Sequence, residues 1–438
     1  MTSVIVGFSH LLLSKITGYL DDNVDRICFS LVCKRWFHDR DSYLMFNTDE
    51  LKLKYSYCKR FYLRSYQSIY EKSLKQVKES SLYINEHDSI SAIHDYSFTI
   101  GIYQATNIRK MIGCTTLEYG LPPNLTHLSF SQNFNEPLFQ GCFPSSLKKI
   151  KFNLGFSQSI PPDVLPSQLE KLVIDNDQVT IEPGLFPSSL TILKLPSTEH
   201  TLQPGSIPPN LEYLEITIKT VPTTWIPAIR YLSNLTTLLF FNARSSAVGN
   251  VDLSQLPPTL TTLRFHSVYN LTSAVHPSIK QLDISFCNYD INEIFPTSNK
   301  YHFHQLSTTL PHDNSKAWKR LKIDKLVVCS LSPQKPIHSI PKGILTLDVR
   351  HRLNLKDPKL PNSIQKLKLT YPSYITETSN CSVPNNVRIM KIVDILSKKP
   401  TLAIPKSVRT IYLSTMSNSK LDWLQNQKVG SISLYYIW

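Results

Sequence analysis

The chain has 438 residues, of which 41% are hydrophobic and 18% charged, with a formal net charge of +14. It is too long for one ordinary compact core and too hydrophobic for wholesale disorder, so several domains or an elongated repeat array are expected. No run of about 18 apolar residues and no signal-peptide pattern occurs, which argues against a membrane span or secretion. We therefore expect a protein of the cytoplasm or nucleus with no membrane partner.

The eight cysteines are scattered and contain no CxxC pair, so they predict neither a disulfide framework nor a zinc site. Reduced and mostly buried thiols are the simplest expectation. Cys28 and Cys33, which are close in sequence, are predicted to be buried on one helix.

The N-terminal segment, residues 1–46, has a helical pattern. Residues 8–20 (FSHLLLSKITGYL) place apolar side chains on one broad face, Ser9 is a candidate N-cap, and a second apolar stripe follows the polar run 21–23. One interpretation is an inert helical cap, because a solenoid needs its ends covered.

The same segment resembles the F-box, a small three-helix motif. The resemblance rests on residues 8–20 together with SLVCKRW at 30–36, although Phe8-Ser9 stands where the motif usually has Leu-Pro. An F-box binds the small adaptor subunit of a cullin–RING ubiquitin ligase. The resemblance therefore implies an adaptor-binding surface made by Phe8, Leu12, Leu13, Ile16, Leu20, Leu31 and Val32.

Residues 47–120 contain no clear repeat, and we treat them as a connecting or N-terminal capping region. The basic, tyrosine-rich stretch 54–78 is a candidate helix, and strand-like turns are expected near 98–108.

From residue 121 to the C-terminus, the phrase Pro-x-x-Leu-x-x-Leu-x-apolar recurs. Its anchors, the first leucine of each phrase or its equivalent, are 19–25 residues apart, except for one gap of 44 that predicts a degenerate unit around Tyr301. The anchors are Leu125, Leu147, Leu169, Leu190, Leu211, Leu235, Leu260, Ile279, Ile323, Ile344, Ile364, Val387, Val408 and Val429.

Each phrase predicts one turn of a solenoid. The residues after an anchor alternate as in a short strand, and stacked turns bury together what one turn cannot bury alone. Proline suits the corner that enters a strand, and a Gly or Asp six residues before several anchors predicts a tight turn. A period of about 22 residues leaves no room for a long helix, so loops or short 3₁₀ pieces are expected on the convex side.

The pattern resembles the leucine-rich repeat, and more narrowly the FNIP repeat, through Phe134-Asn135-Glu136-Pro137, Gly141 and the FPSSL that follows. The expected fold is an α/β repeat, a leucine-rich-repeat-like solenoid with a parallel β-sheet on its concave face, preceded by the small helical F-box-like segment. The order of the two parts resembles the F-box and FNIP repeat-containing proteins.

No nucleotide-binding, hydrolase or metalloprotease motif is present, so we predict no catalytic site, no cofactor and no metal. His302-Phe303-His304 is an HxH pair of the kind that can bind metal, but no third ligand accompanies it at a sensible spacing. We expect these histidines to be ordinary surface side chains.

The positive charge gathers late in the chain, with a net +13 in residues 301–410. Lysines two and four residues after the anchors should form rows on the concave sheet, where they would attract an acidic protein or, as the alternative, nucleic acid. The expected substrate-binding residues are Lys149, Lys151, Tyr213, Glu215, Arg264, Lys366, Lys368, Lys391 and Tyr412.

These features together predict a substrate-recruiting subunit of a cullin–RING ubiquitin ligase, in which the F-box binds the ligase adaptor and the repeats bind a target protein. The alternative is a protein- or nucleic-acid-binding repeat scaffold without a ubiquitin role, whose helical cap is inert.

Overall fold

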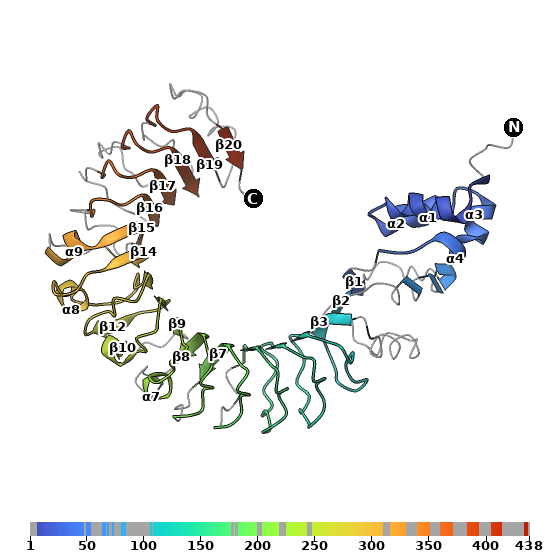
Figure 1. Cartoon of the computed structure of the whole chain (residues 1–438), viewed down its shortest axis with the longest axis horizontal. Helices are drawn as coiled ribbons and strands as arrows, with labels where there is room; N and C mark the ends of the chain where they lie inside the picture. The colour runs from blue at the N-terminus through green and yellow to red at the C-terminus, as the bar shows by residue number, and fades with distance from the viewer. Residues whose placement is uncertain are drawn as a thin grey trace. The chain divides into compact units, whose positions relative to one another are not determined.

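A computed structural model of the chain divides into two units, Met1–Pro196 and Ser197–Trp438 (Figure 1). The structure describes residues 7–47, 50–53, 64–66, 68–69, 72–73, 80–84, 106, 108–176, 179, 183–198, 204–218, 225–242, 248–309, 316–329, 340–350, 360–370, 383–393, 404–413 and 433–436. Most of the stretch 54–78, and the expected turns at 98–105, lie outside these residues. No helix in the described ranges is long and apolar enough to cross a membrane.

The first unit begins with four short helices, α1 (His10–Gly18), α2 (Asn23–Ser30), α3 (Lys34–His38) and α4 (Arg40–Tyr43). Local sequence explains where the first two start. The Ser9 hydroxyl accepts a hydrogen bond from the Leu12 N–H, and the Asp22 carboxylate accepts one from the Val24 N–H at 2.6 Å. The predicted Ser9 N-cap and the helical pattern are confirmed.

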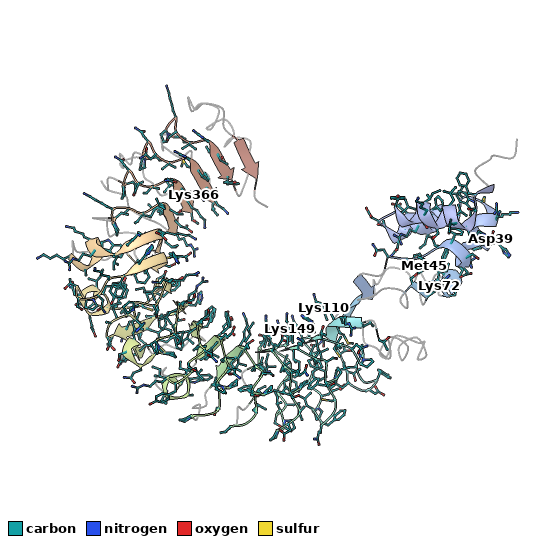
Figure 2. The ribbon with its side chains drawn as sticks, viewed as in Figure 1. Asp39, Met45, Lys72, Lys110, Lys149 and Lys366 are labelled. Atoms are coloured by element: carbon teal, nitrogen blue, oxygen red, sulfur yellow. The ribbon has the colours of Figure 1, made fainter. Side chains whose placement is uncertain are left out.

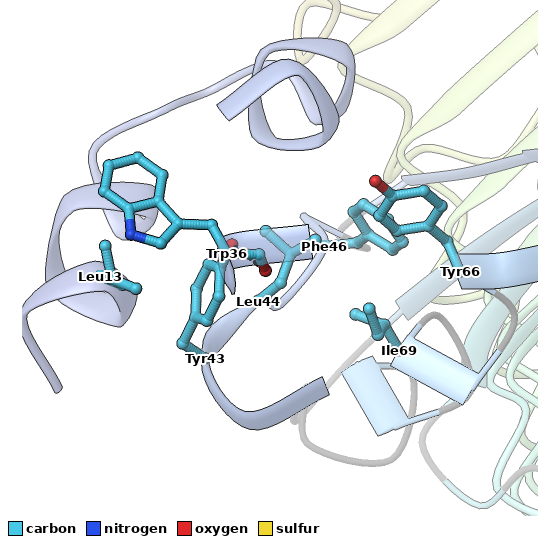
Figure 3. Close-up of a cluster of buried hydrophobic side chains, with 7 residues drawn as sticks. All are labelled: Leu13, Trp36, Tyr43, Leu44, Phe46, Tyr66 and Ile69. Carbon is cyan, nitrogen blue, oxygen red and sulfur yellow. Dashed lines mark hydrogen bonds between the residues drawn. The ribbon is translucent and has the colours of Figure 1, made fainter. Parts of the chain in front are cut away.

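A compact apolar core holds these helices together (Figure 3). Trp36 is buried in this core and stacks on Phe29 with ring centroids 4.7 Å apart, and its carbonyl accepts a hydrogen bond from the Tyr43 hydroxyl. The core consists of Leu13, Trp36, Tyr43, Leu44, Phe46, Tyr66 and Ile69. The helical segment therefore has a hydrophobic centre of its own.

The repeats of the first unit form a parallel strand ladder. Each strand pairs with the next one in the chain, from β1 through to β7. The strands are β1 (Glu50–Leu53), β2 (Ser80–Ile84), β3 (Ile108–Cys114), β4 (His127–Phe130), β5 (Lys149–Phe152), β6 (Lys171–Ile174) and β7 (Ile192–Thr198). Three strands before residue 121 thus belong to the ladder. Their phrases lack the Pro-x-x-Leu spacing that marks the later turns.

The core of this ladder is built as the anchors predict. Leu125, Leu147, Leu169 and Leu190 are fully buried, and the residues three positions later pair in register from strand to strand. Next to this column the buried aromatic rings Phe130, Phe134, Phe152 and Phe156 stack on one another.

The turns also follow the sequence. Gly141, Gly184, Gly205 and Asp163 all have positive φ, between 60° and 88°, which is the left-handed conformation that the tight-turn prediction requires. Before each of β4 to β7, the anchor N–H donates to the carbonyl of the proline three residues earlier, as in the 3.1 Å bond from Leu147 to Pro144.

The second unit contains a longer parallel ladder. In the part of it that is described, its strands lie on the inner side of a curve and the short helices on the outer side (Figure 1). The strands are β8 (Tyr213–Ile218), β9 (Thr237–Asn242), β11 (Thr262–Phe265), β13 (Gln281–Asp283), β14 (His302–Thr308), β15 (Lys322–Cys329), β16 (Thr346–Arg350), β17 (Lys366–Thr370), β18 (Ile389–Val393), β19 (Thr410–Leu413) and β20 (Ser433–Tyr436).

Among the described residues, the outer side of this unit carries only short elements, in agreement with the short repeat period. They are α7 (Ile226–Ile229), α8 (Ile291–Ile294), α9 (Lys316–Arg320), the 3₁₀ turn Leu253–Gln255, and β10 (Gly249–Asp252) paired with β12 (Tyr269–Thr272). The predicted fold class, a leucine-rich-repeat-like parallel β-solenoid with few helices at its N-terminal end, is confirmed.

The degenerate unit predicted around Tyr301 is confirmed. The buried Phe303 pairs in register with the anchor Ile323, so Phe303 takes the anchor position of that unit. The predicted anchor Val429 lies outside the described residues. Strand β20 pairs Leu434 with Ile411, so one more strand follows β19 in the ladder.

Candidate functional site

The outward face of strands β3 to β6 carries a row of basic side chains. The parallel register pairs Lys110 with His127, His127 with Lys149, and Lys149 with Lys171, each on a neighbouring strand. Strand neighbours are about 4.8 Å apart, so these four side chains, here called the basic row, form one continuous strip. Figure 2 labels Lys110 and Lys149 on it.

The charges of the basic row act on one another. Burial lowers the pKa of His127, and the ammonium groups of Lys149 and Lys110 lower it further. His127 is therefore neutral at pH 7, and three lysines carry the charge of the row. The sequence named Lys149, and Lys171 follows the same rule of a lysine two residues after an anchor, but Lys110 and His127 were missed. Only strand pairing shows that Lys110, which precedes the first clear phrase, belongs to the row.

Two lysines next to the basic row form ion pairs within the protein. The Lys151 ammonium lies 3.0 Å from the Asp175 carboxylate, and the Lys148 ammonium lies 2.7 Å from the Glu170 carboxylate. Lys151 was predicted to contact substrate, yet its charge is already paired. Within the basic row, Lys149 and Lys171 form no ion pair with a described carboxylate, in contrast to Lys148 and Lys151.

The predicted contacts in the second unit are also tied to their neighbours. The Tyr213 hydroxyl donates to the Glu215 carboxylate at 2.7 Å, and the Arg264 guanidinium donates to the Gln281 side chain at 2.9 Å. These side chains lie on the strand face, as predicted, and their polar groups form hydrogen bonds with neighbouring side chains.

An acidic residue on the later strands, Asp348, forms ion pairs with some of the basic side chains there. Asp348 on β16 is only 3% exposed, and its carboxylate lies 3.2 Å from the Lys368 ammonium and 3.4 Å from the Arg350 guanidinium. Lys366 is exposed on the same face (Figure 2). Lys391 pairs in register with Lys368 and with Tyr412, both partly buried. Of the predicted pair Lys366 and Lys368, Lys368 therefore has its charge compensated by Asp348.

The adaptor-binding residues implied by the F-box resemblance fall into two groups. Leu12, Leu31 and Val32 are 41%, 56% and 64% exposed, and Ile16 and Leu20 are half-buried. Two others point into the helical core.

Leu13 is fully buried in that core, and Phe8 is half-buried and stacks on Trp36. Their contribution is therefore structural. The helix also exposes Leu11 and Tyr19, which flank the implied residues, and Val24 on α2 is exposed as well. Helical periodicity alone does not separate the exposed side chains from the buried ones, because apolar residues occupy both sides of this short helix.

The prediction that Cys28 and Cys33 are buried on one helix is wrong. Cys28 is exposed on α2, and Cys33 is the N-cap of α3, where its sulfur accepts a hydrogen bond from the Trp36 N–H. The other described cysteines are buried and free, as expected, and burial raises the pKa of the Cys114 thiol to about 12.

The HxH pair has a third neighbour that sequence spacing does not show. His302 and His304 lie 3.1 and 3.0 Å from the two carboxylate oxygens of Asp324 on the adjacent strand. Hydrogen bonds from both imidazoles lower the pKa of the Asp324 carboxyl. All three side chains are partly exposed.

Comparison with known proteins identifies the repeat. The FNIP Repeat family matches residues 116–155, 134–177, 156–198 and 176–217, four overlapping segments that begin just before β4. The chain carries FNIP repeats. An FNIP repeat-containing protein of Dictyostelium discoideum is 27% identical over 198 residues, which are 38% of this chain and 38% of that relative. The match thus spans well under half of the relative's length.

Among solved structures, the crystal structure of CroV588, described as a novel circular LRR protein, aligns with a TM-score of 0.47 at 17% identity. The alignment covers 84% of this chain and 64% of that one. The FNIP repeats and the parallel ladder make the chain a repeat scaffold suited to binding other proteins.

Proposed function

We propose that this FNIP repeat protein recruits a target to a cullin–RING ubiquitin ligase, with the N-terminal helices binding the ligase adaptor and the repeats binding the target. Stacked repeats present an extended row of outward strand side chains, and a surface of this kind suits the binding of another protein. The observation that carries the adaptor half is the set of exposed apolar side chains on α1 and after α2.

Those apolar side chains are not needed to hold the helices together. The core around Trp36 is closed by Leu13, Tyr43 and Leu44, which are buried, while Leu12, Leu31 and Val32 remain exposed. Exposed large apolar side chains favour a protein partner, because covering them removes apolar area from water. The resemblance of residues 8–36 to the F-box makes a ligase adaptor the partner that we propose.

The adaptor half predicts the effect of two charges. In the full chain, Leu12→Asp combined with Leu31→Asp should reduce capture of a purified ligase adaptor subunit by at least tenfold, since both carboxylates would have to be desolvated at the contact. Both side chains are exposed, so circular dichroism should show an unchanged fold. Binding is measured by pull-down and by biolayer interferometry.

Leu154→Asp is the matched control, because Leu154 is 66% exposed on a repeat turn of the same unit and should leave capture unchanged. Equal capture by the double variant and the wild-type chain would contradict the adaptor role. The remaining explanation would then be the inert helical cap.

For the target half, the basic row favours an acidic protein segment. Lys149 is exposed and Lys171 half-buried on adjacent strands, and an extended acidic chain could lie across them. Charge of this kind steers an oppositely charged partner and sets specificity. Outward positions of β3 to β6 hold no Phe, Tyr or Trp, and single-stranded nucleic acid is normally held by stacking on such rings.

Reversing two charges of the row tests the target half. Lys149→Glu with Lys171→Glu should weaken binding of a fluorescent poly-glutamate peptide by about tenfold, since two attractions worth up to about 1 kcal/mol each become repulsions. Anisotropy is measured at near-physiological salt. The control, Lys342→Glu with Lys406→Glu, changes the net charge equally at exposed positions on the turns that precede two strands.

Equal weakening by both pairs would mean that only net charge matters and would contradict a site on the basic row. Tighter, strongly salt-dependent binding of single-stranded DNA than of the peptide would favour the nucleic-acid scaffold instead.

A further inference from the structure

Two histidines project from the same side of strand β14. His302 and His304 flank Phe303, which is fully buried, and side chains alternate along a strand. Both imidazoles therefore lie on the face opposite the core. Their ring centroids are 5.4 Å apart. A His-x-His pair on a strand brings two nitrogen ligands to one place without any special backbone geometry.

The parallel register supplies a carboxylate to this pair. Phe303 pairs with Ile323 and Gln305 with Lys325, which places His304 beside Asp324 on β15. His302 Nε2 lies 3.1 Å from one Asp324 oxygen, and His304 Nδ1 lies 3.0 Å from the other. The three donor atoms, one from each side chain, lie within 4.8 Å of one another.

We propose that His302, His304 and Asp324 form a surface site for a late divalent transition-metal ion, of which Zn²⁺ fits best. Two neutral imidazoles and one carboxylate are a ligand set that Zn²⁺ favours, and Mg²⁺ and Ca²⁺ prefer oxygen ligands alone. Ligand atoms around a tetrahedral Zn²⁺ are about 3.3 Å apart, given metal–ligand bonds of about 2.0–2.1 Å. The His–Asp separations are already close to that value.

The arrangement is held in place before any ion binds. The ligands stand on paired strands, and each imidazole already faces the carboxylate, so binding replaces a hydrogen between the two groups by a metal ion. Partial exposure of the three side chains leaves the fourth position to water or to a ligand from a partner protein.

Nearby lysines set an upper limit on the affinity. Lys322 pairs with His302 across the strands. On the other side, the backbone carbonyl of Lys280 accepts a hydrogen bond from the backbone N–H of His304, so Lys280 is also close. Their ammonium groups repel a cation, although Lys280 directs its ammonium group toward the Pro277 carbonyl. With one carboxylate and this repulsion, micromolar rather than nanomolar binding of Zn²⁺ is expected.

The test is a titration of the full chain with Zn²⁺ by isothermal calorimetry, after accessible thiols such as Cys28 have been alkylated with iodoacetamide. One ion should bind per chain. His304→Ala and Asp324→Asn should each weaken binding at least tenfold. His276→Ala, which removes an exposed histidine on a turn of the same unit, should leave it unchanged.

A second measurement separates metal binding from folding. Zn²⁺ at saturating concentration should raise the melting temperature of the wild-type chain, since the ion links two strands and binds only the folded state. Zn²⁺ should not raise the melting temperature of the His304→Ala variant. In the presence of a chelator, the variant and the wild-type chain should have the same melting temperature. Absence of one-to-one Zn²⁺ binding below about 100 μM, or equal binding by the wild-type chain and the Asp324→Asn variant, would overturn the proposal.

Discussion

Replacing Phe152 with alanine should lower the free energy of unfolding of the repeats in Met1–Pro196 by about 3–5 kcal/mol. Phe152 is fully buried and stacks on Phe130 of the preceding strand at 5.0 Å and on Phe156 of its own turn at 4.3 Å. The substitution opens a cavity and removes both ring contacts. Each contact is worth about 0.5–1.5 kcal/mol beyond the buried area.

The effect should be local as well as large, because each solenoid turn is stabilised chiefly by its immediate neighbours. Urea denaturation followed by circular dichroism measures the loss, and hydrogen exchange locates it in β4 to β6. Phe139→Ala is the control, since Phe139 is 58% exposed and should cost less than about 0.5 kcal/mol. A Phe152→Ala chain as stable as the Phe139→Ala chain would contradict the ring ladder as a source of stability.

The sequence predicted the solenoid because its determinants are local. A buried anchor and a strand residue three positions later recur from copy to copy, and several copies add a turn residue six positions before the anchor. The positive φ of Gly141, Gly184 and Asp163 matches that spacing. The strands β1 to β3 escaped notice because their phrases lack the proline and the regular period. In the structure they join the ladder through backbone hydrogen bonds, which do not depend on the pattern of side chains.

The candidate sites were harder to predict, because they depend on which residues become neighbours. Asp324 is 20 residues from His304, and only the register between β14 and β15 brings them together. Lys151 and Asp175 likewise meet across strands. On the helices, Leu12 and Leu13 have the same chemistry in the sequence, but the packing of Trp36 buries only Leu13.

The outward strand face also limits its own binding capacity. Lysines alternate with core residues along the strands, as the pattern predicts, yet paired carboxylates on neighbouring strands take up the charge of Lys151 and Lys368. A charge count over 301–410 therefore overestimates what a partner would encounter there. For the acidic target that we propose, the relevant positions are the few, such as Lys149, that face a lysine rather than a carboxylate on the next strand.

Gly155→Ala should be as damaging as a core deletion, although it adds only one methyl group. A Cβ built on Gly155 would lie 1.9 Å from the Gln132 carbonyl oxygen and 3.3 Å from Asn133 Cα, both backbone atoms of the preceding turn. Backbone cannot rotate away as a side chain can, so the two turns must separate. Overpacking of this kind costs about 1–3 kcal/mol, and we expect the upper end of that range.

Two other glycines serve as controls for the steric cause. A Cβ at Gly18 meets no atom within 4 Å and φ there is not positive, so Gly18→Ala at the end of α1 should leave the free energy of unfolding nearly unchanged. Gly184 also has open space but a φ of +83°, so its substitution should cost about 1 kcal/mol through backbone strain alone. Urea denaturation of the three variants should therefore rank Gly155→Ala as least stable, then Gly184→Ala, then Gly18→Ala. If Gly155→Ala were no less stable than Gly184→Ala, close contact between the turns would not be what requires glycine at position 155.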